Sequence, residues 1–231
     1  MRKIKKIIVL ILIIVFSYNI YFLNFSNNNF SMQDDLIEKL SSNMPNYTRI
    51  DKIPEYLKNA TIAVEDRRFY THGGFDIRSI GRAAVVNLKE GEIKEGGSTI
   101  TQQLAKNLFL TNEKSYIRKI KELGLALKIE DKYSKDEILE MYLNVVYYGA
   151  NSYGVAEASK KYFNKEVWKL SLGECAMLAG LTQAPSSYEP SKYYTKAKKR
   201  QEIVLKSMYR YGSIDEKLME EGIKETIDIY N

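Results

Sequence analysis

Cysteine and histidine are almost missing from this 231-residue chain, which has only Cys175 and His72. A single cysteine excludes an intramolecular disulfide, and one residue of each type is too few for a zinc site with Cys and His ligands. Cys175 lies within the apolar sequence CAMLAGL, which is typical of a buried, inert thiol. The sequence therefore favours neither a disulfide framework nor a zinc centre.

Proline is scarce as well, with four residues in the chain. Proline interrupts helices because it lacks a backbone N–H, so its scarcity leaves room for long helices. Hydrophobic residues make up 45% and charged residues 28% of the chain, which is ordinary for a folded protein and argues against wholesale disorder. The length allows one sizeable core together with an anchor, or at a stretch two small domains.

Most of the chain has little net charge. The net charge is +6, but four of these charges come from basic residues among the first six positions, and +2 remains for everything that follows. A nearly balanced domain gives little support for nucleic-acid binding, and we expect no nucleic-acid partner.

A strongly apolar segment, IIVLILIIVFSYNIYFL, spans residues 7–23. Its length lies at the short end of the range for a membrane-spanning helix. The alternative is a cleaved signal peptide, but cleavage usually needs small residues, and no alanine or glycine precedes Ala60. We therefore expect a retained transmembrane anchor.

Charge around this segment predicts its orientation. The basic residues lie within positions 1–6, whereas the first charged residue after the segment is Asp34. By the positive-inside rule, residues 1–6 form a cytoplasmic tail and the chain beyond the anchor lies outside the cell membrane. The polar residues 24–50 then form a tether to a domain at 51–231.

From Asp51 onward the apolar pattern is helical almost throughout, and we predict a mainly α fold in one compact domain with a smaller lobe. A short extended piece fits residues 145–148. The helices are expected at 54–65, at 77–88 with a stop at Gly91, at 98–108 with Ser98 as N-cap, and at 115–132. Capping-box pairs at the start of further helices are expected at Ser134/Glu137, Ser171/Glu174 and Ser213/Glu216.

Three segments hold polar residues that a simple core does not explain. Residues 65–76, EDRRFYTHGGFD, crowd acids, arginines and a histidine around a helix end and a glycine turn, where a carboxylate can face a cleft. Residues 96–107, GGSTITQQLAKN, begin a helix whose free N–H groups suit an anion. Residues 118–122, RKIKE, place Arg118 and Glu122 four positions apart, so that they can pair along a helix.

Each of these segments by itself has an ordinary structural explanation. A Glu–Arg pair is usually a solvated surface pair, a Ser/Thr-rich helix start is usually a cap, and a lone histidine is more often structural than catalytic. Composition and periodicity alone support only a membrane-anchored helical domain with a polar cleft.

Taken in order, the three segments and two later ones, YYGANSYGVAEASKKYF and LSLGECAMLAGLTQAPSSYEP, resemble the signature motifs of family 51 glycosyltransferases. These are the peptidoglycan polymerase domains of bifunctional penicillin-binding proteins and of monofunctional transglycosylases. The resemblance covers residues 51–212. It implies a lysozyme-like, mainly α glycosyltransferase domain with a small membrane-proximal lobe.

The resemblance also assigns roles to residues. Glu65 matches the general base and Glu122 the second essential carboxylate, both catalytic. Lys106 and Lys114 match positions that contact the donor's pyrophosphate, although relatives more often carry arginine at 114, so the charge is kept and bidentate geometry is lost. The expected substrate-binding residues are Asp66, Arg82, Ser98, Gln102, Gln103, Lys106, Lys114 and Arg118.

The implied reaction moves a growing glycan from undecaprenyl pyrophosphate to the GlcNAc 4-hydroxyl of lipid II. Inversion turns the α-linked donor into a β-1,4 product, with two carboxylates roughly 6.5–9.5 Å apart. One carboxylate takes the hydroxyl proton, and lysines or a divalent cation, magnesium or manganese, stabilise the departing pyrophosphate. No tightly bound cofactor and no protein metal site are expected. Moenomycin mimics the donor in this family.

The expected partners are lipid II, the nascent glycan strand and the membrane, together with a transpeptidase, the divisome or the elongasome. The expected location is the cell membrane, as a single-pass protein. Two alternatives stay open: a lysozyme-like lytic transglycosylase that cleaves glycan, and a non-catalytic scaffold of wall assembly. The sequence has neither Ser-x-x-Lys nor Lys-Thr-Gly, so we expect a monofunctional enzyme without transpeptidase activity.

Overall fold

The computed structural model describes residues 36–91, 96–110 and 115–230. The predicted cytoplasmic tail, the anchor at 7–23 and much of the tether lie outside these residues, as does Lys114. Within the described ranges no helix is both long and apolar enough to cross a membrane.

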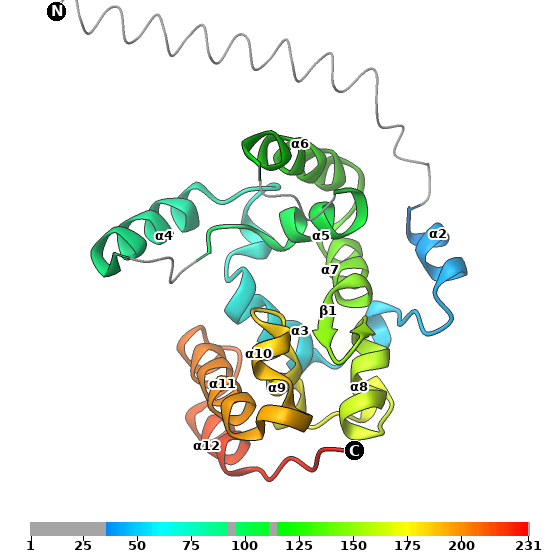
Figure 1. Ribbon diagram of the computed structural model, residues 1–231, viewed down its shortest axis with the longest axis vertical. Coiled ribbons are helices and arrows are strands. Elements are labelled where there is room, and N and C mark those ends of the chain that lie inside the picture. The colour runs from blue at the N-terminus through cyan, green and yellow to red at the C-terminus, as the bar shows by residue number, and fades with distance from the viewer. Residues whose placement is uncertain (1–35, 92–95, 111–114, 231) are drawn as a thin grey trace, which may run out of the picture. The chain divides into compact units, whose positions relative to one another are not determined.

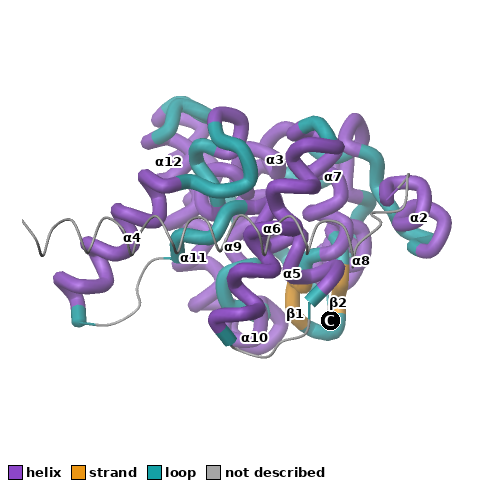
Figure 2. Tube along the Cα trace, turned by 90° about the horizontal axis from the view of Figure 1, so that it is seen from above, coloured by secondary structure: helices purple, strands orange, loops and turns teal. Residues whose placement is uncertain are grey.

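The chain divides into two units after residue 39, and the second covers residues 40–231. The helix α2 spans the division, and everything that follows concerns the second unit. The described residues of this unit form helices almost throughout, with one small pair of strands among them (Figures 1 and 2), which confirms the mainly α prediction. The elements are α2 (Leu36–Asn43), η1 (Ile50–Lys52), α3 (Glu55–Glu65), η2 (Phe69–Thr71), α4 (Ile77–Glu90), α5 (Ile100–Phe109), α6 (Tyr116–Lys132), α7 (Lys135–Val145), β1 (Tyr147–Gly149), β2 (Ser152–Tyr153), α8 (Val155–Phe163), η3 (Val167–Lys169), α9 (Leu172–Leu181), α10 (Pro185–Tyr188), α11 (Pro190–Arg210) and α12 (Glu216–Lys224).

The core of this unit centres on α9, which is apolar along most of its length and buried from Gly173 to Leu181. It packs against both α3 and α11. Gly180 lets α11 pass close, since a Cβ there would stand 2.9 Å from Cγ of Arg200. Cys175 is buried here as predicted, and burial raises the pKa of its thiol. Because each large buried side chain contributes about 1.5–3 kcal/mol, α9 fixes the positions of its two neighbours firmly.

A second group of packed helices consists of α5, α6 and α7. Leu104 of α5, Leu125 of α6 and Ile138 of α7 are fully buried. In Figure 1, α3 lies between this group and the helices α11 and α12. Two of the polar motifs, residues 65–76 and 96–107, lie where α3 ends and where α4 and α5 begin, whereas the third, residues 118–122, lies within α6.

Most of the predicted helix boundaries are confirmed. Ser115 caps α6, and capping boxes open α7 at Ser134 and α9 at Ser171. Gly91 ends α4 with a φ of 69°, a left-handed conformation that glycine adopts at little cost.

The predicted N-cap of α5 is wrong by one position. Thr99, not Ser98, caps the helix, because Thr99 forms a capping box with Gln102. A box needs Glu or Gln three residues after the cap, and the residue in that position after Ser98 is Thr101.

The predicted N-cap of α12 is wrong as well. Asp215 caps this helix in place of Ser213, and its Oδ1 accepts the N–H of Leu218 at 2.8 Å. Ile214 is buried, so the chain leaves the core before the helix begins.

The extended piece predicted at 145–148 is shifted along the chain. α7 continues to Val145, and β1 pairs antiparallel with β2. Ala150 and Asn151 join the strands with φ values of 45° and 60°, the conformation that two-residue hairpin turns require.

Candidate active site

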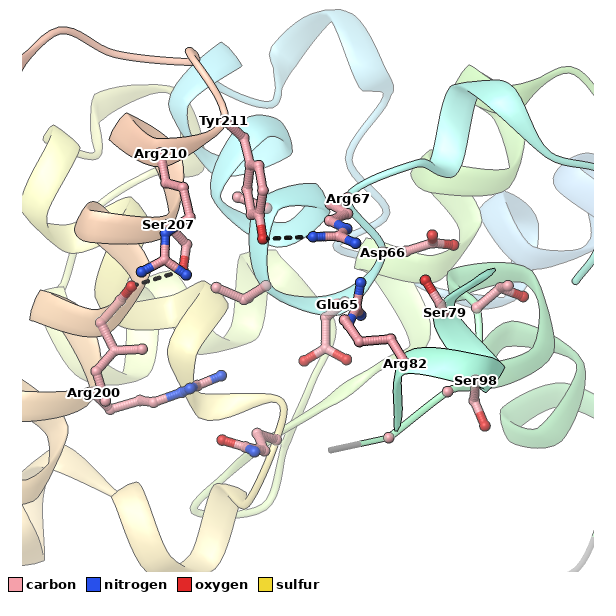
Figure 3. Close-up of a pocket in the computed structure, with 17 residues that line it drawn as sticks. Glu65, Asp66, Arg67, Ser79, Arg82, Ser98, Arg200, Ser207, Arg210 and Tyr211 are labelled. Atoms are coloured by element: carbon pink, nitrogen blue, oxygen red, sulfur yellow. Dashed lines mark hydrogen bonds between the residues drawn. The ribbon is translucent and has the colours of Figure 1, made fainter. Parts of the chain in front are cut away.

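A cleft of about 380 Å³ is lined by residues from the end of α3, from α4, from the start of α5 and from α11 (Figure 3). Four arginines and two carboxylates face it, so it is polar and rich in cations. Such a lining suits a substrate that carries negative charge. The ionic residues of the lining are Glu65, Asp66, Arg67, Arg82, Arg200 and Arg210.

Glu65 is the last residue of α3, and its carboxylate is held by two donors from distant parts of the chain. Thr182 Oγ1 donates to Glu65 Oε1 at 2.7 Å, and Gln103 Nε2 donates to Glu65 Oε2 at 2.7 Å. In Figure 3 the carboxylate projects into the cleft, with Arg82 and Arg200 on either side of it. The predicted general base is therefore oriented before any substrate binds.

Gln103 is itself fixed by a buried phenol. Tyr142 donates from its hydroxyl to Gln103 Oε1 at 3.2 Å, which turns the amide nitrogen toward Glu65. Burial, with the nearby Glu65 charge second, raises the pKa of Tyr142 well above its ordinary value. The phenol thus keeps its proton and remains a donor at neutral pH.

Asp66 follows Glu65 and is almost fully buried, in contact with two groups. Its carboxylate lies 2.8 Å and 2.9 Å from His72 Nε2 and accepts the N–H of Ile100 at 3.1 Å. Asp66 thereby ties the exit of α3 to the start of α5. It thereby also holds the backbone next to Glu65.

This contact corrects one expectation from the sequence. The start of α5 was expected to offer free N–H groups to an anion, but the N–H of Ile100 already binds Asp66. The N–H groups of Thr99 and Gln102 are taken by their mutual capping box. An internal carboxylate and a cap therefore take three of the N–H groups that this segment was expected to offer.

Asp76 anchors the turn that leads from this motif into α4. Its buried carboxylate accepts hydrogen bonds from Arg68 Nε at 2.9 Å and Ser79 Oγ at 2.6 Å, and it caps the N–H of Arg78 at 2.9 Å. The Arg68 guanidinium, which also forms an ion pair with it, holds the pKa of Asp76 well below its usual range. The loop between α3 and α4 is therefore held in one conformation.

Glu122 is buried in α6 and pairs with two cations on its own helix. Arg118 Nη1 lies 2.9 Å from Glu122 Oε2, which confirms the predicted pairing, and Lys119 forms a second ion pair. Lys119 Nζ also donates to Ser98 Oγ at 2.8 Å. Ser98 lines the cleft and Glu122 does not, so Lys119 links the second carboxylate to the cleft edge.

The other predicted substrate-binding residues fall into different places. Arg82 lines the cleft from α4. Gln102 is buried and its Oε1 accepts the N–H of Thr99 in the cap. Lys106 lies half-buried in the last turn of α5, outside the cleft lining. Lys114 lies outside the described residues.

Sequence reasoning missed the contribution of α11. Arg67 Nη1 donates to the hydroxyl of Tyr211 at 3.1 Å, and its guanidinium lies 5.5 Å from that ring's centroid. Arg200 donates from Nε to Gly180 O at 3.2 Å, and burial lowers its pKa while Glu65 acts in the opposite direction. The sequence of α11 is rich in lysine throughout, so no local pattern separates Arg200 and Arg210 from a solvated face.

The described residues do not form a metal site. Among them no group of three His, Cys, Asp or Glu side chains could hold an ion together. Glu65, Asp66 and Glu122 already engage donors or cations of the protein itself.

The fold and the site together define a class of protein: a helical domain with an oriented carboxylate in an arginine-lined cleft. A sequence model of the transglycosylase family matches residues 33–209, and the chain belongs to that family. The resemblance drawn from the motifs is thus confirmed.

The chain is similar to penicillin-binding protein 1A of Aquifex aeolicus, with 50% identity over 183 residues that make up 79% of this chain and 25% of that protein. It is 44% identical to penicillin-binding protein 1A of Neisseria gonorrhoeae over 198 residues, which are 86% of this chain and 25% of that protein. A crystal structure of penicillin-binding protein 1A from Haemophilus influenzae aligns with a TM-score of 0.40 and 31% identity, over 57% of this chain and 16% of that one. The chain spans about a quarter of the length of the curated relatives it matches.

Proposed function

We propose that this protein is a peptidoglycan glycosyltransferase that polymerises glycan strands from lipid II. The observation that carries the proposal is the Glu65 carboxylate, held by two donors in a cleft lined by four arginines. Membership of the transglycosylase family and the similarity to penicillin-binding proteins 1A support it. A basic carboxylate beside cations suits the joining of sugars that carry pyrophosphate.

In this proposal Glu65 is the general base. A sugar hydroxyl is a poor nucleophile, so the proton of the acceptor's 4-hydroxyl moves to Glu65 while its oxygen bonds to C1 of the donor sugar. The bond between C1 and the pyrophosphate oxygen breaks, and its electron pair leaves with the pyrophosphate. Attack on the opposite face of C1 turns the α-linked donor into a β-1,4 product.

Cations stabilise the charge that develops on the departing pyrophosphate. We assign this role to Arg82 in the cleft and to Lys106 and Lys114. Glu122, with the cations beside it, orients the donor rather than taking the proton. Guanidinium groups add directional hydrogen bonds to phosphate oxygens, which point charges do not.

We further propose that residues 7–23 anchor the protein in the cell membrane with the N-terminus in the cytoplasm. Both substrates are lipids of that membrane, so an anchored domain meets them in two dimensions. A transpeptidase, the divisome or the elongasome would then act on or beside the glycan product. Protease added to intact protoplasts should degrade the domain, and full protection would contradict this orientation.

The activity is tested by supplying purified full-length protein with lipid II in detergent and separating the products by size. We expect polymer that a β-1,4 muramidase digests, and inhibition by moenomycin. Glu65→Gln should give no polymer, whereas Glu220→Gln, an exposed residue of α12, should match the wild type. Absence of polymer from the wild-type protein would contradict the proposal.

The same preparations separate the two alternatives. A lytic transglycosylase would release fragments from finished glycan and leave lipid II unused. A non-catalytic scaffold would do neither. The donors around Glu65 and the arginines near it favour synthesis, because both alternatives lack a pyrophosphate to bind.

A further inference from the structure

Thr182 touches the proposed base and has no assigned role. It directly follows α9, and its hydroxyl lies 2.7 Å from Glu65 Oε1 and 2.8 Å from the carbonyl oxygen of Ala179. The preceding residues of α9 are buried without interruption from Gly173 to Leu181. The hydroxyl is therefore held at a fixed point beside the carboxylate.

A threonine hydroxyl has one hydrogen, so it donates to one acceptor at a time. The groups beside it are the Glu65 carboxylate, the Ala179 carbonyl and the Tyr142 hydroxyl. While Glu65 is ionised, the hydrogen is best placed on Oε1, since hydrogen bonds to charged groups are the stronger ones. Once Glu65 carries a proton, the Thr182 hydrogen can turn to the Ala179 carbonyl. Thr182 Oγ1 then presents a lone pair to the Glu65 hydroxyl. The side chain can serve both protonation states without moving its heavy atoms.

The other carboxylate oxygen has no such partner. Glu65 Oε2 faces Gln103 Nε2, an amide nitrogen that donates and does not accept. The hydrogen bond from Tyr142 to Gln103 Oε1 prevents the amide from turning round. A proton on Oε2 would therefore meet an N–H group, which cannot accept it. A proton on Oε1 meets the Thr182 hydroxyl, which can change from hydrogen-bond donor to acceptor.

We propose that Thr182 is a positioning residue that orients Glu65 and directs the acceptor's proton to Oε1. This inference rests on the proposed function, in which Glu65 is the base. In the step, the O–H bond of the acceptor hydroxyl breaks and an O–H bond forms at Glu65 Oε1. Thr182 keeps its own proton throughout and only rotates it.

The experiment uses full-length protein, lipid II and three substitutions at one position. Thr182→Val keeps the shape and removes the hydroxyl, Thr182→Ala removes it without placing a methyl group against the carboxylate, and Thr182→Ser retains it. We expect Thr182→Val and Thr182→Ala to lower kcat about tenfold, with KM for lipid II within about twofold of wild type. Thr182→Ser should keep kcat within about threefold.

A matched control is Thr195→Val, since Thr195 is an exposed threonine of α11 outside the cleft lining. It should leave kcat and the melting temperature at wild-type values. The melting temperatures of all Thr182 variants should also stay within a few degrees of wild type, because Thr182 is only half-buried.

The outcomes separate this inference from the proposed function. An active wild-type enzyme with full kcat in Thr182→Val and Thr182→Ala overturns the role of Thr182 and leaves the function standing. Equal losses in all three variants overturn it too, because they would trace the effect to packing. A wild-type protein that makes no polymer overturns the function and this inference together.

Discussion

The two glutamates assigned to catalysis are held in different ways. Glu65 accepts hydrogen bonds from Gln103 and Thr182, which lie 38 and 117 positions away. The cations of Glu122, at Arg118 and Lys119, lie within one turn of its own helix.

The difference between the two settings separates their tasks. The groups bonded directly to Glu65 are neutral donors, which orient the carboxylate without forming an ion pair with it, and the arginines of the cleft lie further off. The groups bonded directly to Glu122 are cations, which offset its charge. A helix alone is enough to bring Arg118 to Glu122, while the surroundings of Glu65 exist only in the folded domain. The Glu65 setting thus suits a base, and the Glu122 setting suits a fixed group beside an anionic donor.

The largest expected effect comes from removing each carboxylate in turn. Glu65→Gln should lower polymerisation about 10²–10⁴-fold because the base is lost, while moenomycin binding is kept. Glu122→Gln leaves Arg118 and Lys119 without their carboxylate, so it should reduce activity and also weaken moenomycin binding. Steady-state kinetics and inhibitor titration measure the two. Near-normal turnover in Glu65→Gln, or normal inhibitor affinity in Glu122→Gln, would erase the contrast.

A second prediction concerns the loop that leads away from Glu65. Asp76→Asn removes the charge that binds Arg68 in a buried setting and should lower the free energy of unfolding by about 2–3 kcal/mol at pH 7. Urea unfolding followed by circular dichroism measures it. Asp228→Asn, at an exposed position, is the control and should change the free energy of unfolding little.

The pH dependence of this effect has a definite sign. The Arg68 guanidinium depresses the pKa of Asp76 in the folded protein, so its stabilising contribution is present above the unfolded-state pKa of about 3.9. That contribution is lost as the pH falls below this value toward the folded-state pKa. The difference between wild type and Asp76→Asn should therefore be constant near neutrality and shrink below about pH 4. A difference that grows in acid would contradict the assignment.

A smaller effect is expected one step further from Glu65. Tyr142→Phe removes the hydrogen bond that orients Gln103, so it should cost about 1 kcal/mol of stability and reduce kcat several-fold. Tyr148→Phe is a matched control, because the buried hydroxyl of Tyr148 has no hydrogen-bond partner among the described residues. Its removal should leave stability equal or higher. The kcat and the melting temperature of both variants are measured. Equal losses of kcat and stability in Tyr142→Phe and Tyr148→Phe would mean that the hydrogen bond to Gln103 is unimportant.

The smallest effect is expected at the ion pairs of Glu122. Lys119→Met removes one of the two cations of Glu122, but Lys119 is 47% exposed and Arg118 remains paired. The free energy of unfolding should change by less than about 1 kcal/mol, and activity by less than about threefold. Lys217→Met, at an exposed pair on α12, should do nothing measurable. A loss as large as that of Glu122→Gln would show that the link through Lys119 to Ser98 governs the second carboxylate.

Sequence reasoning succeeded where the deciding contacts lie within a few residues. The capping boxes at Ser134 and Ser171 and the pair of Arg118 with Glu122 follow from helical spacing, and the structure has them. It failed at Ser98, because the next residue, Thr99, has a capping-box partner in Gln102, and at Ser213, because the buried Ile214 precedes the helix and Asp215 caps it. Residues 7–23 and Lys114 stay predictions.

The sequence by itself determined the helical fold, the order of the motifs and the carboxylates available for chemistry, because helix periodicity and capping are local properties. Only the tertiary structure decided what surrounds Glu65. It brought Thr182 and Gln103 onto opposite carboxylate oxygens and bonded the N–H of Ile100, at the start of α5, to Asp66. The packing of α9 against α3 brings Thr182 to Glu65, and the contacts of Gln103 and Ile100 join α5 to the end of α3. Packing between distant segments leaves no spacing pattern along the chain.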